Sequence, residues 1–287
     1  MSDLEVQAGL ASRARRFGQR RGLGGAEGAA GILAIFLLVS AALPQLIAPG
    51  DPLGIDPLSA FLHPGLNHPF GTDESGRDIF TRVVHGARYS LVIGVVATLI
   101  GLGFGLVLGT LAGMLGRVVD FTVNRFLEVL FAFPGLLLAL LVILVFGPGV
   151  VTATIAVGLS TAPGYARIIR AQLISVRSAA FVEAATVLGR TPWQILSRHI
   201  LPNTLAPLLV LATLGVGQAM VWAATLSYLG LGAEPPTAEW GAMLSAGRTY
   251  ITSAWWMSFF PGLFIVLTAV AATVLGRSVD RRLRHHG

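Results

Sequence analysis

The sequence contains no cysteine and no lysine, and it holds few charged residues of either sign. Without cysteine, the chain can form neither disulfides nor thiolate metal sites. Without lysine, it cannot form the phosphate-binding loop G-x-x-x-x-G-K-[ST], and it also lacks the nucleophile pattern G-x-S-x-G and the metal pair H-E-x-x-H. The sequence therefore gives no support for a catalytic or metal site on this chain.

The composition is that of a polytopic membrane protein. Charged residues make up 12% of the 287 residues, hydrophobic residues 54%, and the mean hydropathy is +0.75, whereas soluble domains carry about 25% charged residues. Crossing the hydrocarbon core takes roughly 20 helical residues. Six largely uncharged runs are predicted to be membrane helices, at 31–49, 89–115, 128–146, 150–165, 205–231 and 255–275, with "GPG" at 147–149 separating the third from the fourth.

The first run could be either a secretory signal or a membrane helix. Arginines precede it, as they do in a signal peptide, but the run is longer than the 7 to 15 residues typical of a signal. The prolines of the following "APGDPLGIDP" also make a poor cleavage site. We therefore expect a retained transmembrane helix.

The arginines predict the orientation, because cytoplasmic loops of membrane proteins are enriched in basic residues. With a cytoplasmic N-terminus, sixteen of the twenty arginines lie inside; the four outside are Arg77, Arg82, Arg88 and Arg248. The fold class is therefore all-α with six transmembrane helices and both termini cytoplasmic. The predicted layout is an N-terminal tail (1–29), a first transmembrane helix (30–49), an extracytoplasmic segment (50–88), a five-helix core (89–277) with a cytoplasmic loop at 178–203, and a basic cytoplasmic tail (278–287).

The cytoplasmic loop contains a polar stretch, "EAATVLGRTPWQILSRHILP", from Glu183 to Pro202. Gly189 falls where a helix would end. Thr191 then fits an N-cap, with Pro192 at the first helical position and Gln194 completing a capping box. This predicts two short helices joined at a glycine. From periodicity alone, they could equally be an amphipathic connector lying on lipid headgroups.

The pattern Glu-Ala-Ala, three residues, Gly, and a later Leu-Pro resembles the EAA loop of inner-membrane subunits of binding-protein-dependent ABC importers. Two further stretches, "HPFGTDESGRDIFTRVVHGARYSL" (68–91) and "LSYLGLGAEPPTAEWGAMLSAGRTYITSAWWMSFFPGL" (226–263), are similar to signature regions of the C-type permease subunit of dipeptide, oligopeptide and nickel importers. The resemblance implies the type I importer permease fold in a bacterial cytoplasmic (inner) membrane.

The resemblance also implies residue roles and partners. The residues expected to couple to the ATPase are Glu183, Ala184, Ala185, Gly189, Arg198, Leu201 and Pro202. The extracytoplasmic signature residues are Gly71, Thr72, Asp73, Gly76, Arg77, Asp78, Glu239, Trp240 and Gly241. The expected partners are a B-type sister permease forming a heterodimer, two cytoplasmic ATPase subunits that carry ATP and magnesium, an extracytoplasmic substrate-binding protein, and membrane lipid. The chain itself needs no cofactor and is not an enzyme; nucleic acid is not a partner, and the substrate-binding residues stay unknown.

Several features have a structural interpretation beside a functional one. "GTDESGRD" could hold a cation, but a self-paired turn is favoured because the ligand spacing is wrong for calcium. The glycines at 101, 103, 105 and 109 favour helix packing over a channel lining, and Glu128 favours pairing with Arg125 over a proton relay. Pro134 and Gly135 could break the third helix, Trp240, Trp255 and Trp256 suit the interfacial belt, and the two outer segments suit either loop packing or docking of the binding protein.

The resemblance predicts a permease that moves peptides at the expense of ATP hydrolysed elsewhere, with nickel or glutathione as alternative cargo. An ion-driven secondary transporter is the alternative from a different class. Such a transporter should place ionisable groups near the bilayer midplane. The middles of the six predicted helices carry no charge, which favours the importer. The tail departs from the family's acidic ending, since Arg277 stands where an aspartate is common, and it is expected to act as a positive-inside anchor.

Overall fold

The computed structural model describes residues 25–285, apart from the side chains of 205, 206 and 282–285. Within this range the chain is helical, and its only β pairing is an isolated bridge between Thr72 and Asp78. The predicted N-terminal tail lies outside these residues as far as residue 24. The long helices are Gly25–Ala42, α3 (Ile79–Met114), α4 (Arg117–Phe131), α5 (Gly135–Phe146), α6 (Val150–Arg177), α9 (Leu201–Tyr228) and α11 (Trp256–His285). The short ones are α2 (Pro44–Ile47), η1 (Pro57–Ser59), α7 (Ala180–Val187), α8 (Pro192–Ile195), the π-turn η2 (Leu196–Ile200), α10 (Trp240–Gly247) and η3 (Arg248–Tyr250).

Fewer helices than predicted are both long and apolar enough to cross a membrane. Within the described residues, four qualify: Gly25–Ala42, Ile79–Met114, Pro207–Tyr228 and Trp256–Arg281. A fifth span is formed if α4 and α5, which meet at a bend of 90°, are taken together as one broken span. The 28 residues of α6 are about 42 Å long, but three arginines and several hydroxyl residues lower its hydropathy.

Several helices extend beyond their predicted boundaries, because the predictions ended each helix close to a charged residue. α3 begins at Ile79 rather than at 89, since Asp78 caps its first turn and Arg82 bonds to carbonyls outside the helix. α6 and α11 continue past the predicted ends at 165 and 275. An uncharged run marks the part of a helix that suits lipid, whereas the helix itself can continue into water.

The predicted single helix over 128–146 is wrong. Glu128 lies in the last turn of α4, and α5 starts only at Gly135. Pro134, which has no backbone N–H, stands at the break and prevents one helix from running through it. The expected pairing of Glu128 is confirmed, because Arg125 Nη1 lies 2.7 Å from Glu128 Oε2.

The small residues of α3 allow α6 to pack close to it. A Cβ at Gly101 would stand 2.5 Å from Thr161 Oγ1, and one at Gly105 would stand 2.6 Å from Tyr165 Cβ. Gly109 has the same role against Ala166 and Ile169, whereas Gly103 has no neighbour within 4 Å. The expectation of a packing face is therefore confirmed for the three glycines at four-residue spacing, and it is wrong for Gly103, which lies on the other side of the helix.

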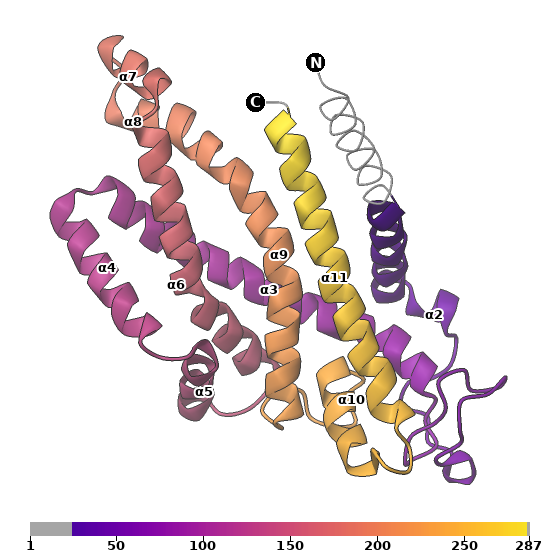
Figure 1. The fold of residues 1–287 in the computed structure, drawn as a ribbon. Helices are drawn as coiled ribbons and strands as arrows, with labels where there is room; N and C mark the ends of the chain where they lie inside the picture. The colour runs from indigo at the N-terminus through magenta and orange to yellow at the C-terminus, as the bar shows by residue number, and fades with distance from the viewer. Residues whose placement is uncertain (1–24, 286–287) are drawn as a thin grey trace, which may run out of the picture.

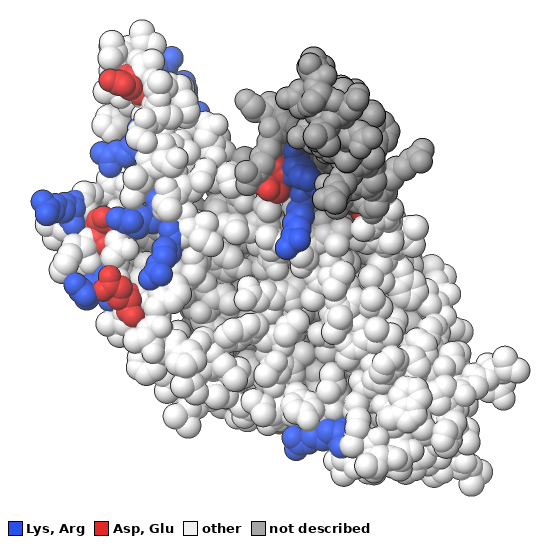
Figure 2. All heavy atoms as spheres, in the orientation of Figure 1, with Lys and Arg blue, Asp and Glu red and all other residues white. Residues whose placement is uncertain are grey.

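The two ends of the helical bundle differ in character. α7 and α8 lie at one end, where α11 ends and the helix Gly25–Ala42 begins, while α10 and the segment 50–78 lie at the opposite end (Figure 1). We call these the hairpin end and the α10 end. On the face shown in Figure 2, charged side chains gather at the hairpin end and over α4, and a broad belt between the two ends is uncharged. Such a belt suits a chain that crosses a bilayer.

Candidate functional site

The segment "GTDESGRD" folds into a compact turn before α3. Gly71 and Gly76 both have φ of +75°, and a Cβ at Gly76 would stand 1.7 Å from the Asp56 carbonyl oxygen. Asp73 Oδ1 accepts from the backbone N–H of Ser75 (2.8 Å) and Arg77 (2.9 Å), and its Oδ2 lies 2.7 Å from Arg77 Nε. The expectation of a self-paired turn is therefore confirmed.

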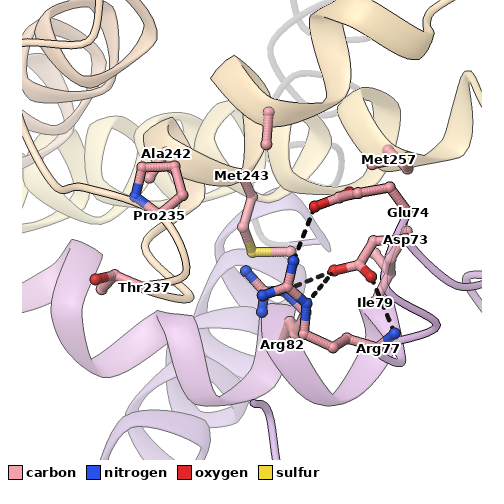
Figure 3. A pocket seen from close by; sticks show the side chains of 11 residues that line it. Asp73, Glu74, Arg77, Ile79, Arg82, Pro235, Thr237, Ala242, Met243 and Met257 are labelled. Carbon is pink, nitrogen blue, oxygen red and sulfur yellow. Dashed lines mark hydrogen bonds and ion pairs between the residues drawn. The ribbon is translucent and has the colours of Figure 1, made fainter. Parts of the chain in front are cut away.

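Arg82 is the buried centre of the α10 end (Figure 3). Its guanidinium donates to the carbonyl of Pro52 at 3.0 Å and to that of Pro236 at 3.1 Å, and its Nε lies 3.7 Å from Asp73 Oδ2. One side chain of α3 thus joins the loop before η1 to the loop before α10. The sequence analysis counted Arg82 only as an outside charge, because its carbonyl partners Pro52 and Pro236 lie 30 and 154 residues away in the sequence.

Glu239 caps α10. It is 3% exposed, and its two carboxylate oxygens accept from the backbone N–H of Gly241 and Ala242, both at 2.8 Å. Ser90 of α3 donates to the same carboxylate at 3.3 Å and accepts from the backbone N–H of Trp240. Gly241 has no room for a side chain, since a Cβ there would stand 2.8 Å from Ala224 Cα.

Two of the tryptophans expected in the interfacial belt are core residues instead. Trp240 and Trp256 are 0% and 1% exposed. Their indole N–H groups donate to the carbonyls of Val83 (2.9 Å) and Thr72 (3.0 Å). The belt prediction is wrong for both because these partners lie inside the protein, and it remains compatible only with Trp255, which is half exposed.

The space among these charged groups is small. The cavity lined by Asp73, Glu74, Arg77 and Arg82 has a volume of about 30 Å³, close to that of one water molecule. Glu74 Oε1 lies 2.8 Å from Arg77 Nη2, and its Oε2 is buried without a partner among the described residues. Between residues 25 and 285, no group of three His, Asp or Glu residues is placed to hold a metal ion. The geometry therefore fits a packed support and leaves no room for a substrate.

The stretch expected to couple to an ATPase forms a protruding hairpin at the hairpin end (Figure 1). α7 ends before Gly189, which has φ of +74°, and the backbone N–H of Arg190 donates to Ala185 O at 3.2 Å. This is the pattern of a glycine-terminated helix. α8 then starts with the predicted capping box: Gln194 N–H donates to Thr191 Oγ1, and Thr191 N–H donates to Gln194 Oε1.

The hairpin has an inner and an outer face. Val182, Ala185, Ile195 and Ile200 pack against Ile169 and other apolar side chains of α6 and α9. The outer face exposes Glu183, Ala184, Gly189 and Arg190, together with three large apolar side chains: Val187 (83% exposed), Leu188 (79%) and Trp193 (73%). Of the two alanines of the Glu-Ala-Ala pattern, only Ala184 is accessible. Arg198 and Pro202 are also exposed, and Leu201 is half-buried where α9 begins.

A paired carboxylate connects the base of this end to α4. Arg170 of α6 binds Asp120 of α4 with two nitrogens, and the Nη2–Oδ2 distance is 2.6 Å. At the other side, Arg281 of α11 pairs with Glu27 of the N-terminal helix. The basic tail continues α11 and is helical as far as His285.

Comparison with known proteins identifies the family. The family model "Binding-protein-dependent transport system inner membrane component" matches residues 105–285. The chain belongs to this family. The dipeptide transport system permease protein DppC of Alkalihalophilus pseudofirmus is 41% identical over 245 residues, covering 85% of this chain and 80% of that protein. The glutathione transport system permease protein GsiD of Escherichia coli is 42% identical over 250 residues, covering 86% and 82%.

Solved structures include chains with the same fold as this one. The inward-facing MetNI methionine ABC transporter superimposes with a TM-score of 0.59 at 20% identity, covering 71% of this chain and 97% of the matched chain. At this low sequence identity, the structural similarity shows that the two chains share a fold and nothing further. The family assignment agrees with the resemblance carried by the EAA loop and the two signature segments.

Proposed function

We propose that this chain is the C-type permease subunit of an ATP-driven importer of dipeptides or oligopeptides. The protruding hairpin carries the proposal, since it offers a partner a surface that residues 25–285 leave exposed. Relatives named as dipeptide and peptide permeases favour peptide cargo. The glutathione permeases among the relatives keep that tripeptide as an alternative.

In this proposal, the hairpin receives the motion of two cytoplasmic ATPase subunits that hold ATP and magnesium. Val187, Leu188 and Trp193 form an apolar tip beside Glu183 and Arg190. Exposed apolar groups gathered at one point mark a protein or membrane contact. Val182, Ala185, Ile195 and Ile200 connect the tip rigidly to α6 and α9, so a push on the tip reaches the membrane core.

The topology follows from the same proposal. Six crossings are formed if Gly25–Ala42, α3, the broken pair α4 and α5, α6, α9 and α11 each cross once. The hairpin end, where the helix Gly25–Ala42 begins and α11 ends, is then cytoplasmic, in agreement with the sixteen arginines assigned to that side. In this proposal a sister permease completes the translocation path, as the resemblance to C-type permeases implies.

The α10 end then receives the substrate-binding protein outside the bacterial inner membrane. Thr72, Asp73, Arg77, Glu239 and Trp240 are buried there, so they support the docking platform from behind. The contact face is formed by the exposed apolar residues of the preceding segment, such as Ile55 (66%), Leu58 (96%) and Leu66 (103%).

The proposal is tested by two measurements: whether the chain assembles with the ATPases and the sister permease, and whether the loaded binding protein stimulates ATP hydrolysis. The tagged chain is co-expressed with its candidate ATPases and sister permease, purified, and assayed in lipid for ATPase activity stimulated by the peptide-loaded binding protein. Glu183→Arg and Gly189→Trp should abolish the stimulation or the association. Glu234→Arg is a matched control for ATPase association, because it makes the same charge change on an exposed residue at the end opposite the hairpin.

The contrary outcome identifies the alternative. If no ATPase associates and uptake follows an ion gradient, with the hairpin variants harmless, the chain is a secondary transporter. If the complex assembles but no peptide stimulates it, while glutathione or a nickel chelate does, only the cargo is wrong.

A further inference from the structure

A hollow lies beside the break between α4 and α5. Its volume is about 310 Å³, within the range found for small-molecule sites. Its walls come from three parts of the chain: Phe131 and Phe133 at the break, Ser160 and Tyr165 of α6, and Gln218 and Trp222 of α9. All side chains that line it are uncharged.

Gln218 is out of place for a lipid-facing helix. It lies near the middle of the candidate span Pro207–Tyr228, and its side chain is exposed. Its amide has no hydrogen-bond partner among the described residues, and an unpaired amide in hydrocarbon is costly. The side chain therefore faces water, a second chain or a ligand.

Trp222 adds a second unpaired donor on the same wall. It lies one turn after Gln218 on α9 and is half-buried, and its indole N–H also has no partner within the described part of the chain. The edge of its ring packs on Gly135, where a Cβ would stand 2.6 Å from Trp222 Cη2. Replacing Gly135 would displace the ring, so the position of the indole depends on the helix break between α4 and α5.

We propose that this hollow, with Gln218 and Trp222 as its hydrogen-bonding groups, binds the backbone amides of the peptide in transit; the inference rests on the proposed function. A peptide bond is a neutral donor and acceptor, and it is present whatever side chains the cargo carries. Neutral amide and indole groups match it, and aromatic rings accept varied apolar side chains. A close contact with the sister permease would instead fill the hollow.

The absence of cysteine makes this testable at one atom. Q218C introduces the only thiol of this chain, and its reaction with a charged, water-soluble thiosulfonate is followed by the mass of this subunit in the assembled complex. We expect it to react at least about tenfold faster than L209C, an exposed position of the same helix outside the hollow. Turnover with a dipeptide and its binding protein should slow the reaction. Equal rates for the two variants would overturn the proposal.

Transport provides the second measurement. Q218L should lower dipeptide uptake into proteoliposomes about fivefold, the effect of one lost hydrogen bond, with assembly of the complex unchanged. Q218N should retain more uptake than Q218L. T225V is the control, because Thr225 Oγ1 already donates to Val221 O of its own helix. Unchanged uptake in Q218L overturns the proposal, and so does loss of assembly, which would make Gln218 a subunit contact. If the native complex moves no peptide, the proposed function itself fails.

Discussion

Gly86 of α3 lies against the backbone carbonyl of Ala238, so close that a Cβ at residue 86 would stand 2.0 Å from that oxygen. A backbone atom cannot move aside as a flexible side chain can. Gly86→Ala should therefore separate α3 from the loop before α10 and lower stability by about 1–3 kcal/mol, as overpacking does. Thermal unfolding in detergent, followed by tryptophan fluorescence, measures it.

Gly103→Ala is the matched control, because Gly103 is in the same helix and has open space around it. Alanine favours a helix over glycine by about 0.5–1 kcal/mol, so this variant should unfold at the same or a higher temperature. If the two variants unfold alike, the close approach at Gly86 does not exist in solution.

Trp240→Phe tests the assignment of Trp240 to the core. The substitution keeps an aromatic ring but removes the N–H that donates to Val83 O at 2.9 Å. We expect a loss of about 1 kcal/mol in the free energy of unfolding. Trp255→Phe should be close to neutral, since Trp255 is half exposed and its indole N–H has no such bond to the described residues. The opposite order of the two effects would return Trp240 to the membrane interface.

Asp73→Asn should be the most damaging change at the α10 end. It removes the carboxylate that lies 2.7 Å from Arg77 Nε and 3.7 Å from Arg82 Nε, and both arginines are buried. Arg77 keeps Glu74 and Arg82 keeps its two carbonyls, so the expected cost is that of a lost charged hydrogen bond, about 1.5–3 kcal/mol. Glu234→Gln removes an exposed carboxylate nearby and should have little effect. Limited proteolysis of segment 50–78 in both variants tests the difference, and equal resistance would contradict it.

Gly189 offers a test of backbone geometry alone. Its φ is +74°, and no atom lies within 4 Å of a Cβ built there. Gly189→Ala should destabilise the hairpin by about 1–2 kcal/mol, whereas Gly189→Asn should be better tolerated, because asparagine adopts this conformation more readily. Hydrogen exchange of residues 180–200 should rise in the first variant and less in the second. Equal exchange in both would mean that the hairpin turn is not held in this conformation.

Local structure could be predicted from the sequence wherever a residue type strongly favours one backbone or packing geometry. The capping box of Thr191 and Gln194, the turn at Gly76 and the packing of Gly101, Gly105 and Gly109 on α6 are of this kind. Such features depend on neighbours within a few residues or on a regular spacing.

The rest depends on partners distant in the sequence. The early start of α3 is stabilised by Arg82, whose carbonyl partners Pro52 and Pro236 lie in two other loops. Trp240 appeared interfacial because nothing near it in the sequence shows that Val83 accepts its N–H. Gln218 could have been noticed, since it is the only amide side chain in the run 205–231, but only the fold places Trp222 and the break at Pro134 beside it.

The bonds of Arg82, Trp240 and Trp256 span 154, 157 and 184 residues of sequence. The chain is synthesised from its N-terminus, so segment 50–78 and the start of α3 leave the ribosome long before α10 and α11 exist. Until those last helices are inserted, the acceptors at Val83 and Thr72 lack their donors and Arg82 lacks one of its carbonyls. The α10 end can therefore be completed only after α10 and the start of α11 have been made, and a chain truncated before them leaves these acceptors and Arg82 without their partners.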